Sequence, residues 1–244
     1  MDEKLIKTEP IGNGREIYVS AHHTFGTDAV LLADFAVAKN GDRVADLGTG
    51  CGIIPFLMLR DRRLSDAVGI DISREAAELA SSSAELNGFS AFKAVCADIK
   101  DLKGKINSGY YTLVTCNPPY KAAGAGIKNS DHTDAVARHE IECTLGDTVK
   151  AAARLLQTGG RLCMCHRPER AAELLRIMSE NGVEPKRLRL VCKKVGCEPW
   201  LVLAEGRRRG KTGLRIMPTL YVYENGGLSD EMKRIYGSYG EGHK

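Results

Sequence analysis

Short apolar stretches typical of β-strands alternate along this chain with longer stretches of helical periodicity. The strand-like stretches cover 42–47, 66–72, 91–97, 111–116, 161–165, 187–195 and 200–205. Helical stretches cover 27–38, 53–60, 73–86, 144–157 and 170–180, and a short helix is expected after Ser229. Strands separated by helices predict a parallel sheet with helices on both faces. The last two strands are so close that they should pair antiparallel. The prediction is an α/β fold with a seven-stranded mixed sheet.

The chain of 244 residues suits a single domain. We expect that domain at 25–206, with a lead-in segment at 1–24 and with a basic loop and tail at 207–244 packed on it. The first residues lack the basic start and apolar run of a secretion signal, and no apolar run approaches the length of a membrane span. We therefore expect a cytoplasmic protein without membrane contact.

The chain has eight cysteines, most of them inside strand-like stretches, where a free thiol acts as a small hydrophobe. Without a secretion signal, reduced thiols are the expectation. Cys163 and Cys165 share one strand face, and four residues separate Cys192 from Cys197. Neither spacing forms the paired halves of a structural metal site, so no metal is expected.

Positive charge is concentrated in one part of the chain. The net charge is +4, but the stretch 186–215 holds ten Lys or Arg residues against Glu198 and Glu205. That stretch therefore carries +8, and the remainder sums to −4. A basic block on an acidic protein indicates either a contact with a polyanion or a lysine-rich strand edge that stays soluble. Charge alone leaves both readings open.

A glycine-rich turn, DLGTGCG at 46–52, follows the first of the alternating strands. In an open parallel sheet, ligands bind at the carboxyl ends of the strands, where glycines let backbone N–H groups approach them. The spacing G-x-G-x-G lacks the third glycine of a dinucleotide fingerprint, because Ile53 occupies that position. No G-K-[ST] follows, which excludes a P-loop.

Acidic residues end the next two strands. Asp71 in GIDIS can accept hydrogen bonds from both ribose hydroxyls of an adenosine, and Ile72 can pack on the adenine. Asp98 in CADIK can accept from the adenine amino group while the Ile99 amide donates to the ring. Each acid alone could be a turn or helix cap. Asp46, Asp71 and Asp98 together, each ending one of three successive strands, favour an adenosine site.

The fourth strand runs into TCNPPY at 115–120. With this motif the chain resembles the class I S-adenosylmethionine-dependent methyltransferases, within the branch that methylates amino groups such as adenine N6 and glutamine N5. The resemblance covers about 25–205 and implies a Rossmann-like fold with S-adenosyl-L-methionine as methyl donor. It also implies that Asp46, Gly48, Gly50, Gly52, Asp71, Ile72, Asp98 and Ile99 bind this cofactor, and that Asn117, Pro118, Pro119 and Tyr120 are catalytic.

The chemistry of amino methylation accounts for these residue types. The lone pair of an adenine N6 amino group is delocalised into the ring, so the enzyme must position the nitrogen and restore that lone pair. The side-chain oxygen of Asn117 and the rigidly held carbonyl of Pro118 can accept the two N–H bonds. Tyr120 would stack on the target base. The purely structural alternative is that Asn-Pro-Pro only terminates a strand.

Three further stretches resemble a narrower family, the bacterial tRNA methyltransferases that modify the adenine 3′ of the anticodon in valine tRNA. These stretches are FGTDAVLL at 25–32, ARHE at 137–140 and MPTLYVYENGG at 217–227. The resemblance implies a tRNA anticodon loop as substrate, whose unpaired adenine needs little extrusion. We expect Arg138, Arg207, Arg208, Arg209 and Lys211 to bind this RNA.

Other readings stay open at this point. His139 can touch RNA or cap the following helix, as can Arg138, and His22 and His23 can contact substrate or be an exposed pair without function. The same chemistry can act on a protein glutamine, an rRNA base or a DNA adenine. A non-catalytic RNA-binding module is the alternative from another class. The oligomeric state is also open.

Overall fold

The structure is a computed structural model that describes residues 6–118 and 143–237. Its strands are β1 (Lys7–Gly12), β2 (Arg15–Val19), β3 (Arg43–Leu47), β4 (Asp66–Asp71), β5 (Phe92–Cys96), β6 (Tyr111–Cys116), β7 (Leu156–His166), β8 (Val183–Cys192), β9 (Pro199–Arg208), β10 (Arg215–Ile216), β11 (Leu220–Tyr221), β12 (Tyr223–Glu224) and β13 (Gly227–Leu228). Its helices are α1 (Thr27–Ala36), α2 (Ile53–Asp61), α3 (Arg74–Asn87), α5 (Leu145–Leu155), α6 (Ala171–Glu180) and α7 (Asp230–Tyr236), with a 3-10 turn at Pro168–Arg170.

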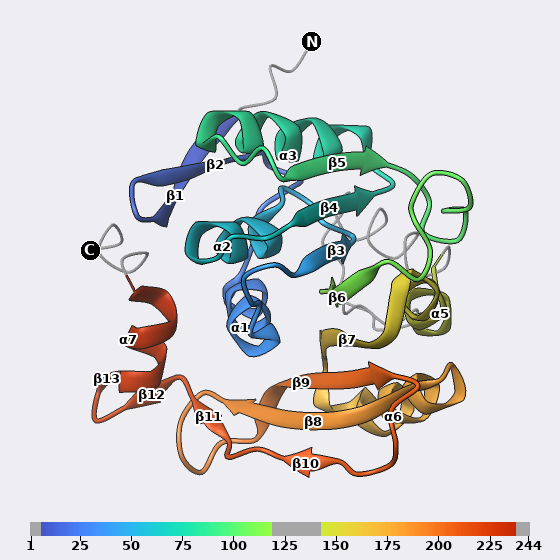
Figure 1. The fold of residues 1–244 in the computed structure, drawn as a ribbon. Helices are drawn as coiled ribbons and strands as arrows, with labels where there is room; N and C mark the ends of the chain where they lie inside the picture. Colours follow the sequence, from blue (N-terminus) through green and yellow to red (C-terminus); the bar gives the residue numbers. More distant parts are fainter. Residues whose placement is uncertain (1–5, 119–142, 238–244) are drawn as a thin grey trace, which may run out of the picture.

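The central sheet has the order β10-β8-β9-β7-β6-β3-β4-β5, which Figure 1 shows from bottom to top. β7, β6, β3, β4 and β5 pair in parallel, whereas β9 is antiparallel to both β7 and β8. The predicted α/β class, its seven longer strands and the antiparallel end are confirmed. Two-residue strands β10 and β11 extend the edge beside β8.

Helices bury one apolar cluster on each face of the sheet. On one face α1, α2, α3 and α7 pack against alternate strand residues such as Val44 and Cys163. On the other face α5 and α6 cover Leu47 and Met164. Residues that alternate along one strand thus enter different clusters, as the period of two in a strand requires. All eight cysteines are free thiols.

Most element ends expected from the sequence lie within a few residues of the ends in the structure. Ser73 caps α3 by accepting from the Ala76 N–H, and Gly88 ends that helix in the left-handed conformation. Thr144 forms a capping box with Asp147 at the start of α5. The prediction that this helix runs to 157 is wrong, because β7 begins at Leu156 and pairs there with Tyr111.

The first 24 residues were expected only to lead into the domain, yet they include the hairpin β1–β2. Asn13 and Gly14 both have positive φ between the two strands. That Asn-Gly pair is the usual sequence signal of a tight hairpin. The hairpin packs on α3, where the Tyr18 N–H donates to Ser83 and Asn87 Nδ2 donates to the Glu16 carbonyl.

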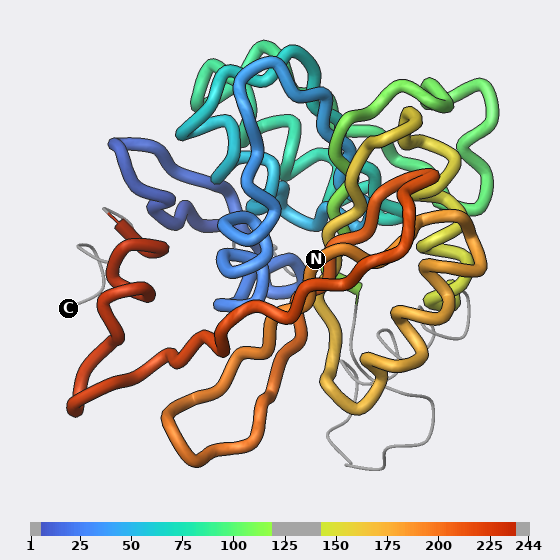
Figure 2. Tube along the Cα trace, turned by 60° about the horizontal axis from the view of Figure 1, so that its bottom comes forward, coloured from blue at the N-terminus to red at the C-terminus, as the bar shows by residue number. Residues whose placement is uncertain are grey.

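The C-terminal stretch runs back along the sheet edge to the N-terminal elements, as the red tube in Figure 2 shows. Its last helix, α7, packs on α1. The Tyr236 hydroxyl lies 3.0 Å from Thr27 Oγ1, and Arg234 forms an ion pair with Asp34 at 2.9 Å. No helix in the described ranges 6–118 and 143–237 is long and apolar enough to cross a membrane.

Candidate active site

A cavity of about 310 Å³ opens where the parallel strands end. Its lining includes residues that directly follow or end five strands: Gly48 after β3, Asp71 and Ile72 after β4, Asp98 and Ile99 after β5, Asn117 and Pro118 after β6, and His166 at the end of β7. The carboxyl edge of a parallel sheet is where backbone groups are left to bind a ligand. Seven of the predicted site residues therefore line one cavity: Gly48, Asp71, Ile72, Asp98, Ile99, Asn117 and Pro118.

A hydrogen bond ties the glycine-rich turn after β3 to Asp71 at the end of β4. The Gly50 N–H donates to Asp71 Oδ2, and the Ser73 N–H donates to Asp71 Oδ1, both at 2.9 Å. Each carboxylate oxygen has more than one acceptor position, so both can still receive a ribose hydroxyl. Gly52 has a φ of +88°, and a Cβ there would lie 2.6 Å from the Phe56 ring. Only glycine fits that position.

Asp46 lies beneath the turn rather than in the cavity wall. Its side chain is fully buried, and Oδ1 accepts from the Thr115 hydroxyl at 2.6 Å. Oδ2 and the Thr49 hydroxyl find no hydrogen-bond partner within the described part of the chain. Burial raises the pKa of the Asp46 carboxyl to about 7, although the hydroxyl of Thr115 lowers it. Of the other turn residues, Gly48 reaches the cavity, whereas Gly50 and Gly52 shape it from outside.

Asp98 and its neighbours form the opposite wall. Asp98 Oδ1 accepts from the Lys100 N–H at 2.8 Å, which turns the chain at the end of β5. The Lys100 ammonium lies 3.7 Å from Asp98 Oδ2. Ile72 is 45% exposed, so an apolar side chain presents its surface to the cavity. An apolar face between two carboxylates fits a flat heterocycle linked to a ribose.

Asn117 is held by two residues that are distant in sequence. Its Nδ2 donates to Asp28 Oδ2 at 3.1 Å, and its Oδ1 accepts from the Cys165 thiol at 3.0 Å. A carboxylate can only accept hydrogen bonds, so Asp28 fixes which end of the amide is the NH₂ group. Asp28 Oδ1 also accepts from the Ala29 N–H at 2.9 Å. A Cβ on Gly26 would lie 2.8 Å from that oxygen, which explains the glycine there.

The remaining predicted and candidate residues fall into two groups: some belong to the described part of the chain, and four do not. Pro118 lines the cavity beside Asn117. Pro119, Tyr120, Arg138 and His139 lie outside the described residues. His23 lines the cavity and its Nε2 lies 3.2 Å from the Ser73 hydroxyl, whereas His22 is exposed. In the described ranges no three His, Cys, Asp or Glu side chains gather as a metal site.

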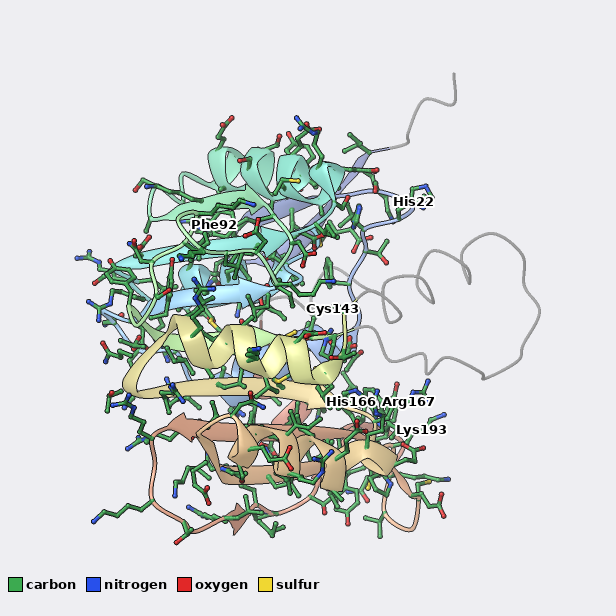
Figure 3. All side chains as sticks on the ribbon, turned by 90° about the vertical axis from the view of Figure 1, so that its right-hand side faces the viewer. His22, Phe92, Cys143, His166, Arg167 and Lys193 are labelled. Carbon is green, nitrogen blue, oxygen red and sulfur yellow. The ribbon has the colours of Figure 1, made fainter. Side chains whose placement is uncertain are left out.

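His166 is a cavity residue that the sequence did not single out. Its side chain is buried, and Nδ1 accepts from the Arg167 N–H at 2.8 Å. Burial and the charge of Arg170 lower its pKa to about 4. The ring is therefore neutral at pH 7, and because Nδ1 is an acceptor, the proton resides on Nε2. Figure 3 shows His166 and Arg167 on the same side of the molecule as Cys143, another cavity residue.

Three of the predicted RNA-binding arginines, Arg207, Arg208 and Arg209, lie at the other end of the sheet. β9 begins beside the cavity, where Val202 pairs with His166, and ends away from it, where Arg207 pairs with Arg161. The loop that holds Arg207, Arg208, Arg209 and Lys211 therefore lies at the amino ends of the parallel strands. Arg208 donates to the carbonyl oxygens of Asn181 and Gly182, which follow α6. These side chains do not reach the cavity.

A family model described as a methyltransferase domain matches residues 38–217. The chain belongs to this methyltransferase domain family. Its methyl donor is S-adenosyl-L-methionine, and the cavity suits that cofactor. The carboxylates of Asp71 and Asp98 in the cavity wall are the polar groups that the hydroxyls and the amino group of a nucleoside need.

Two relatives of this methyltransferase are both named tRNA1(Val) (adenine(37)-N6)-methyltransferase. The protein from Bacteroides fragilis is 29% identical over 175 residues, which cover 71% of this chain and 73% of the relative. The protein from Aeromonas salmonicida is 29% identical over 196 residues, which cover 77% and 79%. A solved structure of a "predicted O-methyltransferase" from Agrobacterium tumefaciens shares the fold, with a TM-score of 0.71, 20% identity and coverage of 87% and 96%.

Proposed function

We propose that this methyltransferase methylates the N6 amino group of an adenine in tRNA, and that the target is adenine 37, next to the anticodon of valine tRNA. The observation that carries the proposal is the fixed amide of Asn117 at the cavity wall. The names of the relatives support the tRNA substrate. A tRNA substrate implies that the enzyme works in the cytoplasm.

The donor site in this proposal consists of the residues at the ends of β3, β4 and β5. Asp71 accepts the ribose hydroxyls while the Gly50 and Ser73 N–H groups hold its carboxylate in place. Ile72 and Ile99 pack on the adenine, and Asp98 accepts from its amino group. Asp46 stabilises the charged end of the donor through Gly48 and the rest of the turn. When bound, S-adenosyl-L-methionine supplies a methyl group on a positively charged sulfur.

The acceptor site consists of Asn117 and Pro118. Asn117 Oδ1 and the Pro118 carbonyl accept the two N–H bonds of the target amine, which draws its nitrogen lone pair out of conjugation with the ring. With the donor bound, that lone pair would form the new N–C bond while the C–S bond of the donor breaks. One N–H proton then leaves to solvent. Asp28 is a positioning residue, because it holds the amide so that oxygen rather than NH₂ faces the amine.

Roles for the residues that the structure does not place at the cavity remain proposals. We infer that Tyr120 stacks on the target base, that Pro119 stiffens the backbone after Pro118, and that Arg138 contacts RNA. Arg207, Arg209 and Lys211 would contact only phosphates remote from the target adenine, because their loop lies at the far end of the sheet. Arg208 is already bound to backbone carbonyls.

The test is methylation of unmodified tRNA by the purified enzyme with S-adenosyl-L-methionine, followed by digestion and mass spectrometry for N6-methyladenosine. We expect the product with the wild type and its loss with Asn117→Ala. DNA, rRNA and protein fractions are assayed in parallel. Product only in one of those fractions would reject the tRNA substrate, and donor binding without any transfer would favour a non-catalytic RNA-binding module.

A further inference from the structure

The turn between β8 and β9 lies at the cavity end of the sheet. Val202 of β9 pairs with His166 on one side and with Leu190 on the other. His166 lines the cavity, and Leu190 comes just before the turn at 193–198. Figure 3 accordingly shows Lys193 on the same side of the molecule as His166 and Arg167. An antiparallel strand thus brings a hairpin turn to the rim of the active site.

A β-bulge at the base of this hairpin contains an exposed aromatic residue. Val191 pairs with Leu201 and Cys192 pairs with Pro199, which leaves Trp200 as an extra residue between them. Bulges re-aim side chains and occur beside active sites. Trp200 is 40% exposed, which is unusual for the largest apolar side chain in the protein. It is also the only tryptophan of the chain.

A second aromatic residue and two lysines surround the same turn. The Tyr223 N–H donates to the Lys193 carbonyl at 2.9 Å, and the Tyr223 side chain is 44% exposed. Lys193 and Lys194 are exposed, and the Cys197 N–H donates to the Lys194 carbonyl, which closes the turn. We call the four residues Lys193, Lys194, Trp200 and Tyr223 the hairpin platform.

We propose that the hairpin platform binds the unpaired nucleotides next to the target adenine by stacking. The proposal rests on the proposed function, because it assigns a contact of the same RNA substrate. Exposed aromatic rings beside cations are the usual means of holding single-stranded nucleic acid, since every base has a face that can stack. Glu198 in the same turn offsets one of the lysine charges.

Position favours this surface over the arginine loop. An RNA base that reaches Asn117 must bring its neighbouring nucleotides to the rim of the cavity, where the platform lies. The loop with Arg207, Arg209 and Lys211 is separated from that rim by the length of β9. The platform therefore contacts the anticodon loop, and the arginine loop contacts at most a distant part of the tRNA.

The single tryptophan makes the contact directly measurable, because its fluorescence reports on Trp200 alone. An unmodified anticodon stem-loop RNA is titrated into the protein, and a duplex of the same length serves as the RNA control. We expect saturable quenching by the stem-loop and little by the duplex. Quenching that is absent while fluorescence anisotropy of labelled RNA shows binding would overturn the proposal.

Variants separate stacking from charge. Trp200→Ala is expected to weaken stem-loop binding about tenfold or more, with Trp200→Phe restoring most of it. Lys193→Ala with Lys194→Ala should lower the slope of log K against log salt by about 1.4. Lys39→Ala with Arg63→Ala removes two exposed charges before β3 and β4, at the end of the sheet away from the cavity; it is the matched control and should leave stem-loop binding unchanged. Equal binding by Trp200→Ala and the wild type would reject the platform.

The two proposals fail in different ways. Stem-loop quenching without N6-methyladenosine would reject the proposed reaction and support the platform. Methylation of tRNA with no quenching, and with full activity of Trp200→Ala at subsaturating RNA, would support the reaction and reject the platform. S-adenosyl-L-methionine affinity, measured by calorimetry, should be the same for all these variants, since no platform residue lines the cavity.

Discussion

At the scale of single residues, the site depends on which atoms of Asn117 face the substrate. Asp28 uses both of its oxygens, one for the Ala29 N–H and one for Asn117 Nδ2. An asparagine in its place has one acceptor oxygen and can serve only one of these donors. Asp28 and Asn117 are separated by 89 positions in the sequence, so their contact depends on the complete fold.

Asp28→Asn should therefore lower kcat about 10- to 100-fold, because a misplaced catalytic group loses its alignment with the acceptor. The affinity for S-adenosyl-L-methionine should change less than about twofold, since Asp28 is not in the donor wall. Asp34→Asn, on the same helix but paired with Arg234, is the control. The role assigned to Asp28 is wrong if steady-state kinetics show an unchanged kcat for Asp28→Asn.

Asp46 illustrates the cost of burying an acid beneath a ligand cavity. Its folded-state pKa of about 7 is above the ordinary value of 3.8, so folding favours the protonated form. The unprotonated carboxylate is therefore destabilising, and stability is lost as the pH rises through the folded pKa. The penalty is small at low pH and complete above pH 7.

Asp46→Asn should be more stable than the wild type above pH 7 without cofactor, by roughly 2–4 kcal/mol. The difference should shrink as the pH falls toward about 4. Urea denaturation at several pH values measures it, and comparison at each pH cancels the opposite effect of His166. Glu169→Gln, at an exposed position, should show a difference that does not vary in this way. A pH-independent gain for Asp46→Asn would contradict the assigned cause.

At the scale of elements, several arginines of the basic stretch 186–215 form contacts within the protein that stabilise the fold. Arg208 donates to the Asn181 and Gly182 carbonyls, which α6 leaves without a helical partner. Arg187 and Arg161 both form ion pairs with the buried Glu205, and Arg189 pairs with Glu231 of α7. Much of the positive charge near the end of the chain is thus engaged inside the protein.

Arg208→Ala should lower the free energy of unfolding by about 1–2 kcal/mol, because two carbonyls lose a charged donor. Its exposed neighbour Arg207 gives the matched control, and Arg207→Ala should stay within about 0.5 kcal/mol of the wild type. Urea denaturation measures both. Equal stability of the two variants would show that the Arg208 bonds do not contribute to stability.

The sequence predicted local features well and long-range pairings poorly. The acids at strand ends, the helix starts near Ser73 and Thr144 and the glycine turn could be predicted, because each depends on a few adjacent residues. The end of the sheet that receives the arginine loop could not, since it follows from the pairing of β9 with β7. The contacts of Asn117 with Asp28 and Cys165 likewise join distant strands and helices.

At the scale of the whole molecule, the proposed donor site joins turns from three strands, so ligand binding should stabilise the entire domain. S-adenosyl-L-methionine at 100 times its Kd should raise the free energy of unfolding by about 2.7 kcal/mol. For a chain of this length that corresponds to an increase in Tm of roughly 5–10 °C. Differential scanning fluorimetry measures the shift.

Asp71→Ala should abolish most of that shift, because it removes the ribose acceptor and releases the Gly50 N–H. Asp66→Ala, at the other end of the same strand β4, is the control and should keep it. Circular dichroism without ligand checks that both variants are folded. A full thermal shift with Asp71→Ala would remove Asp71 from the proposed donor site.

The antiparallel strand β9 also has a consequence for how such an enzyme can diversify. Because β9 begins at the rim, its hairpin is an additional loop beside the cavity that carries none of the donor-binding turns. Changes in the hairpin can therefore accumulate without loss of the cofactor. Exchange of 193–198 between related enzymes is therefore a route to new acceptors that leaves the proposed donor site unchanged.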